Sequence, residues 1–218
     1  MYDHAKFFAG LRSLAPKLTQ SQVDGFNLIL DAGANLPPRH LAYCLATAWH
    51  ETAKAMQPVI ETRTAMDKDN PSVDTAIARL EASWKRGKLP WVKQPYWRKD
   101  ARGLSWLGRG YPQVTHLPNY ARAEKETGIG FTANPDLMLI AANAVPVMFS
   151  GMTKGWFTGH KLADYFLPNG HFSVKDKSGK ESELLTAVDA RHIINGTESA
   201  TTVASYYMVL VKALIPSA

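Results

Sequence analysis

Apolar residues recur every three or four positions along most of the chain, which is the spacing that predicts amphipathic helices. We expect Thr19 to cap the second helix and Pro38 to open the third, while Pro146 should kink a later one. The predicted helices cover residues 4–14, 20–31, 38–51, 71–86, 137–152, a short stretch ending at 166, 183–194, and a last stretch from 197. Strand patterns are few, so the sequence predicts a mainly α fold with at most a small β-hairpin or sheet, in a single domain over residues 1–218.

Two stretches differ from the rest of the chain in composition. Residues 168–182 are polar and rich in Gly, Lys and Ser, which is typical of a surface loop or a small hairpin. An insert over about residues 64–107 holds four of the six tryptophans, Trp84, Trp91, Trp97 and Trp106. Their rings either form one wall of a saccharide cleft, with the interleaved Lys and Arg suited to an acidic polymer, or pin an irregular segment to the domain. The sequence leaves both interpretations open.

The net charge of +6 and the pI near 9.4 favour polyanionic partners such as nucleic acid, anionic lipid or an anionic cell wall. The sequence has no block of five Lys/Arg residues and no zinc-finger spacing, so we expect no nucleic-acid partner. It has neither an apolar run of the roughly 18 residues that a membrane span needs nor a leader-like opening, so we expect a cytosolic product without stable membrane insertion. Cys44, the single cysteine, is expected to be a buried apolar residue.

Two carboxylates at and beyond the end of the third predicted helix have a setting suited to acid/base chemistry. Glu51 lies near the end of the 38–51 helix, in line with Thr47 and Ala48, so a weakly polar surrounding would favour its protonated form. Glu61 follows ten positions later, past the helix-stopping Pro58 and next to Arg63, a surrounding that would favour the carboxylate. One protonated acid facing one carboxylate is the arrangement of a glycosidase. The alternative is that Glu51 is an ordinary solvated residue at a helix end.

A zinc-protease helix is a further possibility that the spacing excludes. His50 and Glu51 begin such a motif, but the second histidine that the metal needs four positions after His50 is replaced by Lys54, a cation. We therefore expect no metal and no cofactor.

Residues 108–120 form a glycine-containing stretch with uncharged hydrogen-bonding side chains. The glycines allow a close approach of the backbone, and Gln113, Thr115 and Asn119 offer the groups that bind sugars. A plain glycine-rich turn followed by a short strand would give the same pattern. The phosphate-binding loop motif is missing from the sequence.

Three separated motifs carry a resemblance to a known family. AWHETAKAMQPVIET at 48–62, GRGYPQVTHLPNY at 108–120 and ARHIINGTESA at 190–200 resemble, in this order and spacing, family 19 glycoside hydrolases. The segment MFSGMTKGWFTGHKLADYF at 148–166 resembles the bacteriophage endolysins of that family. The resemblance runs from about Leu41 to the C-terminus, and it implies the chitinase-like, lysozyme-like helical fold.

The resemblance also implies roles for individual residues. Glu51 matches the general acid, Glu61 matches the general base that activates water, and Thr115 matches the residue that helps to hold this water. The matched or neighbouring positions expected to bind or support the glycan are His50, Arg63, Tyr111, Gln113, Asn119, Arg191 and Asn195. Pro112 and Val114 depart from the family pattern, as does the long insert.

From these residues we expect an inverting endolysin that hydrolyses β-1,4 bonds of peptidoglycan. Such an enzyme would be a monomer that stays in the cytoplasm of the host bacterium until a separate pore-forming protein releases it to the cell wall in the periplasm. A chitinase acting on a neutral polymer, and an inactive wall-binding module, are the alternatives.

Overall fold

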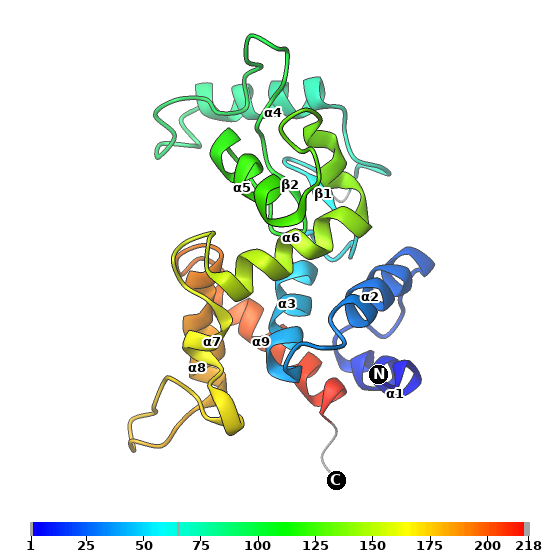
Figure 1. Cartoon of the computed structure of the whole chain (residues 1–218), viewed down its shortest axis with the longest axis vertical. Coiled ribbons are helices and arrows are strands. Elements are labelled where there is room, and N and C mark those ends of the chain that lie inside the picture. The colour runs from blue at the N-terminus through cyan, green and yellow to red at the C-terminus, as the bar shows by residue number, and fades with distance from the viewer. Residues whose placement is uncertain (1, 65, 216–218) are drawn as a thin grey trace. The chain divides into compact units, whose positions relative to one another are not determined.

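The computed structural model describes residues 2–64 and 66–215, and it divides into two compact units. The first unit runs up to Met56 and resumes at Met148, and the second spans Gln57–Val147. Helices dominate both units, which confirms the prediction of a mainly α fold (Figure 1). Within the described ranges, no helix is both long and apolar enough to cross a bilayer.

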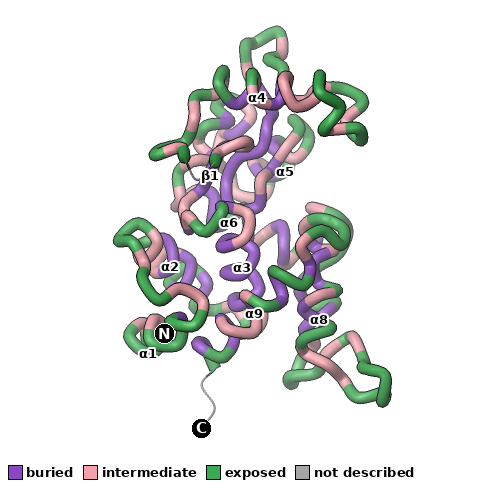
Figure 2. The backbone as a smooth tube through the Cα atoms, turned by 180° about the vertical axis from the view of Figure 1, so that it is seen from behind, coloured by how far each residue is buried: buried purple, intermediate pink, exposed green. Residues whose placement is uncertain are grey.

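The first unit is built from helices around α3. Its elements are α1 (His4–Gly10), η1 (Leu11–Ser13), α2 (Gln20–Ala32), α3 (Pro38–Glu51), α7 (Leu162–Tyr165), η3 (Pro168–Gly170), α8 (Glu183–Asp189), η4 (Ala190–Ile193) and α9 (Ala200–Leu214). Every residue of α3 from Leu41 to Trp49 is buried, and the helix packs against α9 (Figure 2). A helix that is apolar on all sides is the expected centre of a helical core.

Local sequence explains where α2 and α3 begin and end. Thr19 and Gln22 form a reciprocal capping box at the start of α2, as the sequence predicts for Thr19. Pro38 occupies the first turn of α3, where its missing N–H is not needed. Beyond Glu51, the Thr52 hydroxyl donates to the Ala48 carbonyl (2.7 Å) and accepts from the Met56 N–H (3.0 Å). These bonds fix the end of the helix and therefore the place of Glu51.

The second unit contains α4 (Val73–Lys85), α5 (Leu117–Thr127) and η2 (Pro135–Leu139) besides two short strands. Strand β1 (Val59–Ile60) pairs antiparallel with β2 (Arg109–Gly110), Val59 opposite Gly110. This two-stranded sheet agrees with the prediction of at most a small β-hairpin or sheet. The buried core beneath it comprises Ile60, Ala76, Leu80, Trp97 and Leu107. Helix α6 (Ala141–Lys154) contains Pro146, and the division between the units falls inside it.

The tryptophans of the insert do not behave alike. Trp97 is completely buried and Trp106 is almost so, while Trp84 packs against the core and donates its indole N–H to the Val92 carbonyl. Trp91, in contrast, is 72% exposed. The pinning interpretation is therefore right for three of these rings, and only Trp91 is free to contact a ligand with most of its surface.

The structure differs from the predicted helices at three places. The stretch 117–127 is a helix that the sequence pattern did not predict, since residues 108–120 suggested only a glycine-rich turn and a short strand. Pro118 lies in the first turn of this helix, a position that a proline can occupy. The predicted 137–152 helix is split, since Ile140 is extended (ψ 120°) between η2 and α6. The last helix begins at Ala200 rather than Thr197, because Ser199 adopts a left-handed conformation (φ 59°).

We expect Trp97→Ala to destabilise the protein far more than Trp91→Ala. Truncating a large buried aromatic ring typically costs about 3–5 kcal/mol through lost burial and the cavity that remains. A change at an exposed position usually stays within about 0.5 kcal/mol. Thermal unfolding of both variants measures the difference, and equal losses would contradict the assignment of Trp97 to the core.

Candidate active site

Glu51, the last residue of α3, forms an ion pair with Arg191 of η4. The Arg191 guanidinium donates from Nη1 to Glu51 Oε1 at 2.6 Å, and its Nε donates to the Glu198 carbonyl at 2.9 Å. The Arg191 side chain is 4% exposed and that of Glu51 is 15% exposed. A guanidinium held at two points fixes the orientation of the carboxyl group that it contacts. The prediction that Glu51 has a weakly polar surrounding is therefore wrong in one respect, because the guanidinium of Arg191 contacts its carboxyl group.

His50 and Asn195 lie close to this ion pair in the chain. The half-buried His50 ring lies 6.4 Å from the Tyr206 ring, measured between centroids. Burial lowers the pKa of His50, and this effect outweighs the negative charge of Glu51, which would raise it. Asn195 is exposed, and its backbone N–H donates to the Arg191 carbonyl at 3.0 Å. Asn195 thus ends the turn that carries Arg191.

Glu61, in the second unit, has hydrogen-bond donors on both carboxylate oxygens. The Tyr96 hydroxyl donates to Oε1 at 2.6 Å, and the Gly108 N–H donates to Oε2 at 2.7 Å. The Glu61 N–H in turn donates to the Gly108 carbonyl at 2.7 Å. Two donors from separate segments hold this carboxyl group in one orientation.

The hydrogen bond of the Arg63 side chain goes to another residue than its neighbour Glu61. Its guanidinium donates instead to the Asp67 carbonyl at 3.4 Å. The hydrogen bonds expected around Glu61 therefore come from Tyr96 and Gly108, which lie far along the chain from it.

Gly108 is required by the closeness of its neighbours. A Cβ placed on it would lie 2.9 Å from Gln113 Oε1 and 3.2 Å from Glu61 Oε2. Contacts this short would push the carboxyl group away from the Gly108 N–H. The glycine of the second motif thus allows the backbone to approach Glu61 closely.

Other residues of the second motif serve the turn itself. Gln113 (φ 54°) donates from Nε2 to the carbonyls of Val59 (2.8 Å) and Gly110 (3.0 Å), which ties the turn to β1. Tyr111 is completely buried, and burial raises its pKa. The contacts of both residues with substrate remain predictions.

Thr115 faces a cavity of about 630 Å³ in the second unit. The residues lining it are Trp91, Val92, Lys93, Gln94, Tyr96, Thr115 and His116. Tyr96 links this cavity to Glu61, because it lines the cavity and its hydroxyl donates to the carboxylate. Burial and the neighbouring Glu61 charge raise the pKa of Tyr96, so it stays a neutral donor. Asn119 is half-buried near the start of α5, and its N–H donates to the His116 carbonyl at 3.0 Å.

Sequence reasoning missed two residues of this region. Tyr96 lies 35 positions from Glu61, and no local pattern pairs the two. Arg109 is a fully buried guanidinium that contacts Asp136 (2.8 Å), the Ser105 carbonyl (2.9 Å) and the Tyr120 hydroxyl (3.1 Å). These acceptors satisfy the buried cation, and through them Arg109 connects residues before, within and after the second motif.

The two carboxylates belong to different units, Glu51 to the first and Glu61 to the second. Their pairing across one glycosidic bond therefore remains a prediction. Within the residues that the structure describes, His, Cys, Asp and Glu form no group of three that could hold a metal ion. Cys44 is buried, as predicted, and burial raises the pKa of its thiol.

Comparison with known proteins gave a likeness at the level of structure. No protein-family model matches the sequence, and no curated protein matches it. Among solved structures, the chain is similar to a crystal structure of a mutant of chitinase C, with 17% sequence identity and a TM-score of 0.45. The match covers 94% of this chain and 92% of the chitinase chain.

Proposed function

We propose that the protein is a glycoside hydrolase that cuts the β-1,4-linked amino-sugar backbone of peptidoglycan with inversion. Glu51 acts as the general acid and Glu61 as the general base. The proposal starts from the resemblance of three sequence motifs to family 19 glycoside hydrolases.

One observation carries the proposal: the motifs that resemble this family contact one another through the two carboxylates. Glu51 of the first motif accepts a hydrogen bond from Arg191 of the third, within the first unit. Glu61 of the first motif accepts one from the Gly108 N–H of the second, within the second unit. Catalytic carboxylates need such fixed orientations, because a small misplacement lowers the rate of proton transfer.

The chemistry assigns one proton transfer to each carboxyl group. Glu51 gives its proton to the glycosidic oxygen as the bond between this oxygen and the anomeric carbon breaks. Glu61 takes a proton from a water molecule whose oxygen bonds to the anomeric carbon from the opposite face, and Thr115 helps to hold this water. The Tyr96 hydroxyl and the Gly108 N–H keep Glu61 in place throughout.

We propose peptidoglycan rather than chitin as the substrate because the protein is basic. The net charge of +6 attracts a wall that carries carboxylates and phosphates, whereas chitin is neutral. We further propose the endolysin role for the protein: a monomer that reaches the periplasmic face of the wall with the help of a separate pore-forming protein.

A direct assay separates this proposal from its alternatives. Loss of turbidity by permeabilised Gram-negative cells, with soluble reducing sugars released from purified sacculi, is the expected result. Release of oligosaccharides from colloidal chitin alone would favour a chitinase. Binding to sacculi without any soluble product would indicate a wall-binding module. Mass spectrometry of reduced products then identifies which of the two glycosidic bonds is cut.

A further inference from the structure

Trp91 and Lys93 lie together on an exposed segment that the proposed chemistry does not use. Both line the cavity of about 630 Å³ that Tyr96, Thr115 and His116 also line. Trp91 is 72% exposed, although the other tryptophans of the insert pack inward. An exposed indole beside a cavity loses contact with water when a flat ligand covers it, so it favours ligands with an apolar face.

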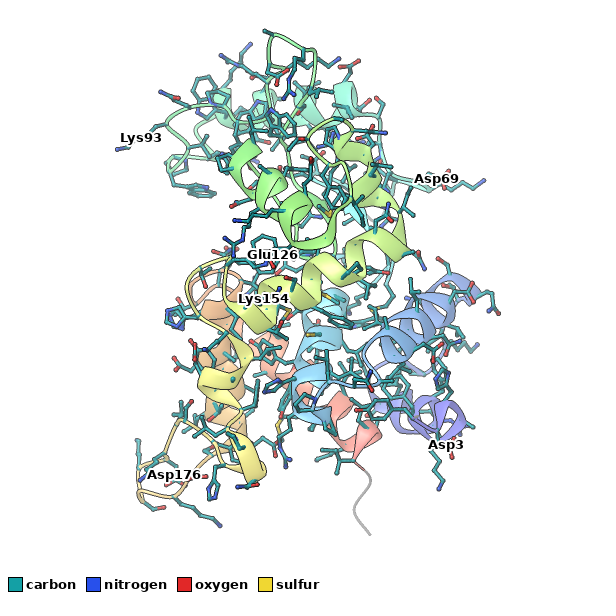
Figure 3. The ribbon with its side chains drawn as sticks, viewed as in Figure 1. Asp3, Asp69, Lys93, Glu126, Lys154 and Asp176 are labelled. Carbon is teal, nitrogen blue, oxygen red and sulfur yellow. The ribbon has the colours of Figure 1, made fainter. Side chains whose placement is uncertain are left out.

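The segment around Trp91 is also strongly basic. No acidic residue occurs between Glu81 and Asp100, while this stretch holds six cations. Two of the six are paired, Arg98 with Glu81 and Lys99 with Asp74. In the described part of the chain, the other four form no ion pair and are exposed: Lys85, Arg86, Lys88 and Lys93. Figure 3 shows the labelled Lys93 side chain pointing outward from its loop. Of these four cations Lys93 lines the cavity, which therefore combines an aromatic platform with one exposed cation.

The position of the cavity connects it to the proposed active site. Tyr96 contributes its ring to the cavity wall and its hydroxyl to Glu61 Oε1 (2.6 Å). The His116 ring packs against the Tyr96 ring, with 4.5 Å between centroids. A sugar bound at Trp91 would thus lie in the cavity lined by the tyrosine that holds the proposed general base. All these residues belong to the second unit.

We propose that this cavity is a subsite for an acidic amino sugar, in which Trp91 stacks on the sugar ring and Lys93 pairs with a carboxylate. The inference rests on the proposed function and makes it more specific, because it assigns selection of a charged glycan over a neutral one to Lys93. In peptidoglycan, the carboxylate comes from the lactyl group of the muramic acid or from the attached peptide. A single-stranded nucleic acid also stacks on aromatic rings beside cations, but the link to Glu61 favours the glycan.

The test is equilibrium binding measured by calorimetry at low salt. The full-length protein carries Glu51→Gln to prevent turnover, and circular dichroism verifies its fold. The ligands are peptide-free glycan strands with a free lactyl carboxylate, intact strands with their peptides, both after reduction of the carboxylates to alcohols, and a neutral N-acetylglucosamine oligomer.

We expect Lys93→Gln to weaken binding of the acidic strands roughly two- to fivefold, the range for an exposed ion pair, and to leave the reduced strands and the neutral oligomer unaffected. Trp91→Ala should weaken binding of all the glycans roughly three- to tenfold, and Trp91→Phe should largely restore it. Lys177→Gln, at an exposed lysine of the first unit, is the matched control and should change nothing. Which unreduced strands show the Lys93 effect identifies the source of the carboxylate.

Equal binding of acidic and reduced strands by wild type and Lys93→Gln would overturn the inference, as would tighter binding of a short single-stranded oligonucleotide than of any glycan. Because binding needs no turnover, these results are independent of catalysis. A protein that binds acidic strands through Trp91 and Lys93 but releases no product with Glu51 intact would refute the proposed function and leave the subsite standing.

Discussion

Glu51→Gln is expected to lower the rate of sacculus hydrolysis by roughly 10²- to 10⁴-fold, which is the usual contribution of general acid catalysis. The amide has nearly the shape of the acid, and its oxygen can still accept the hydrogen bond from Arg191 that Glu51 accepts at 2.6 Å. It has no acidic proton to give to the glycosidic oxygen. The initial rate of reducing-sugar release measures the loss, and circular dichroism verifies that the fold is retained.

The chain offers a matched control for this substitution. Glu183, in the same unit, also pairs with a guanidinium, that of Arg39 at 2.8 Å, and accepts a hydrogen bond from the Tyr207 hydroxyl at 2.7 Å. Glu183→Gln removes a partly buried carboxylate from an ion pair in the same way but should retain most of the activity. If Glu51→Gln keeps more than about a tenth of the wild-type rate, Glu51 is not the general acid.

Glu61→Ala is expected to abolish hydrolysis to a similar extent, because no group then takes the proton from the attacking water. Added azide should restore cleavage, since this anion attacks the anomeric carbon without needing a base and fits the space left by the carboxylate. The product of this rescue should be the α-glycosyl azide. Its formation is followed by mass spectrometry and proton NMR.

Glu124 provides the control for Glu61. Its carboxylate accepts from the Thr132 hydroxyl (2.6 Å) and the Thr132 N–H (2.7 Å), which lowers the pKa of Glu124 and matches the pair of donors around Glu61. Glu124→Ala should leave the rate within a few-fold of wild type. An equal loss in both variants would mean that the carboxylates act only through the stability of the second unit, and failure of azide to rescue Glu61→Ala would count against its role as base.

The parts of the fold that the sequence predicts correctly are those set by neighbours in the chain. The start of α2 depends on Thr19 and Gln22, three positions apart, and the start of α3 depends on Pro38. Helix α5 was not predicted, because residues 108–120 were read as a glycine-containing turn, and Pro118 is compatible with the first turn of a helix without requiring one. The burial of Trp97 and the exposure of Trp91 likewise depend on which face the folded insert turns inward.

In the candidate site, too, the sequence predicts the residues whose type indicates their chemistry but not the distant residues that orient them. The two carboxylates and the glycines of the second motif stand out in the sequence because their residue types have a chemical meaning. The partners that orient them do not, since Arg191 lies 140 positions from Glu51 and Tyr96 lies 35 positions from Glu61. Contacts over such distances arise only when the chain folds. Arg63, the neighbour that the sequence offered to Glu61, turns to Asp67 instead.

The stereochemistry of hydrolysis tests the central claim most directly. Two carboxyl groups that act as acid and base should stand about 6.5–9.5 Å apart with a water molecule between one of them and the sugar, whereas an acid and a nucleophile stand about 5–5.5 Å apart. The first arrangement inverts the anomeric centre and forms no covalent intermediate. Proton NMR of the products from a β-1,4-linked glycan, recorded before mutarotation, should therefore show the α anomer first. Initial appearance of the β anomer would show retention and contradict the assignment of Glu61 as the general base.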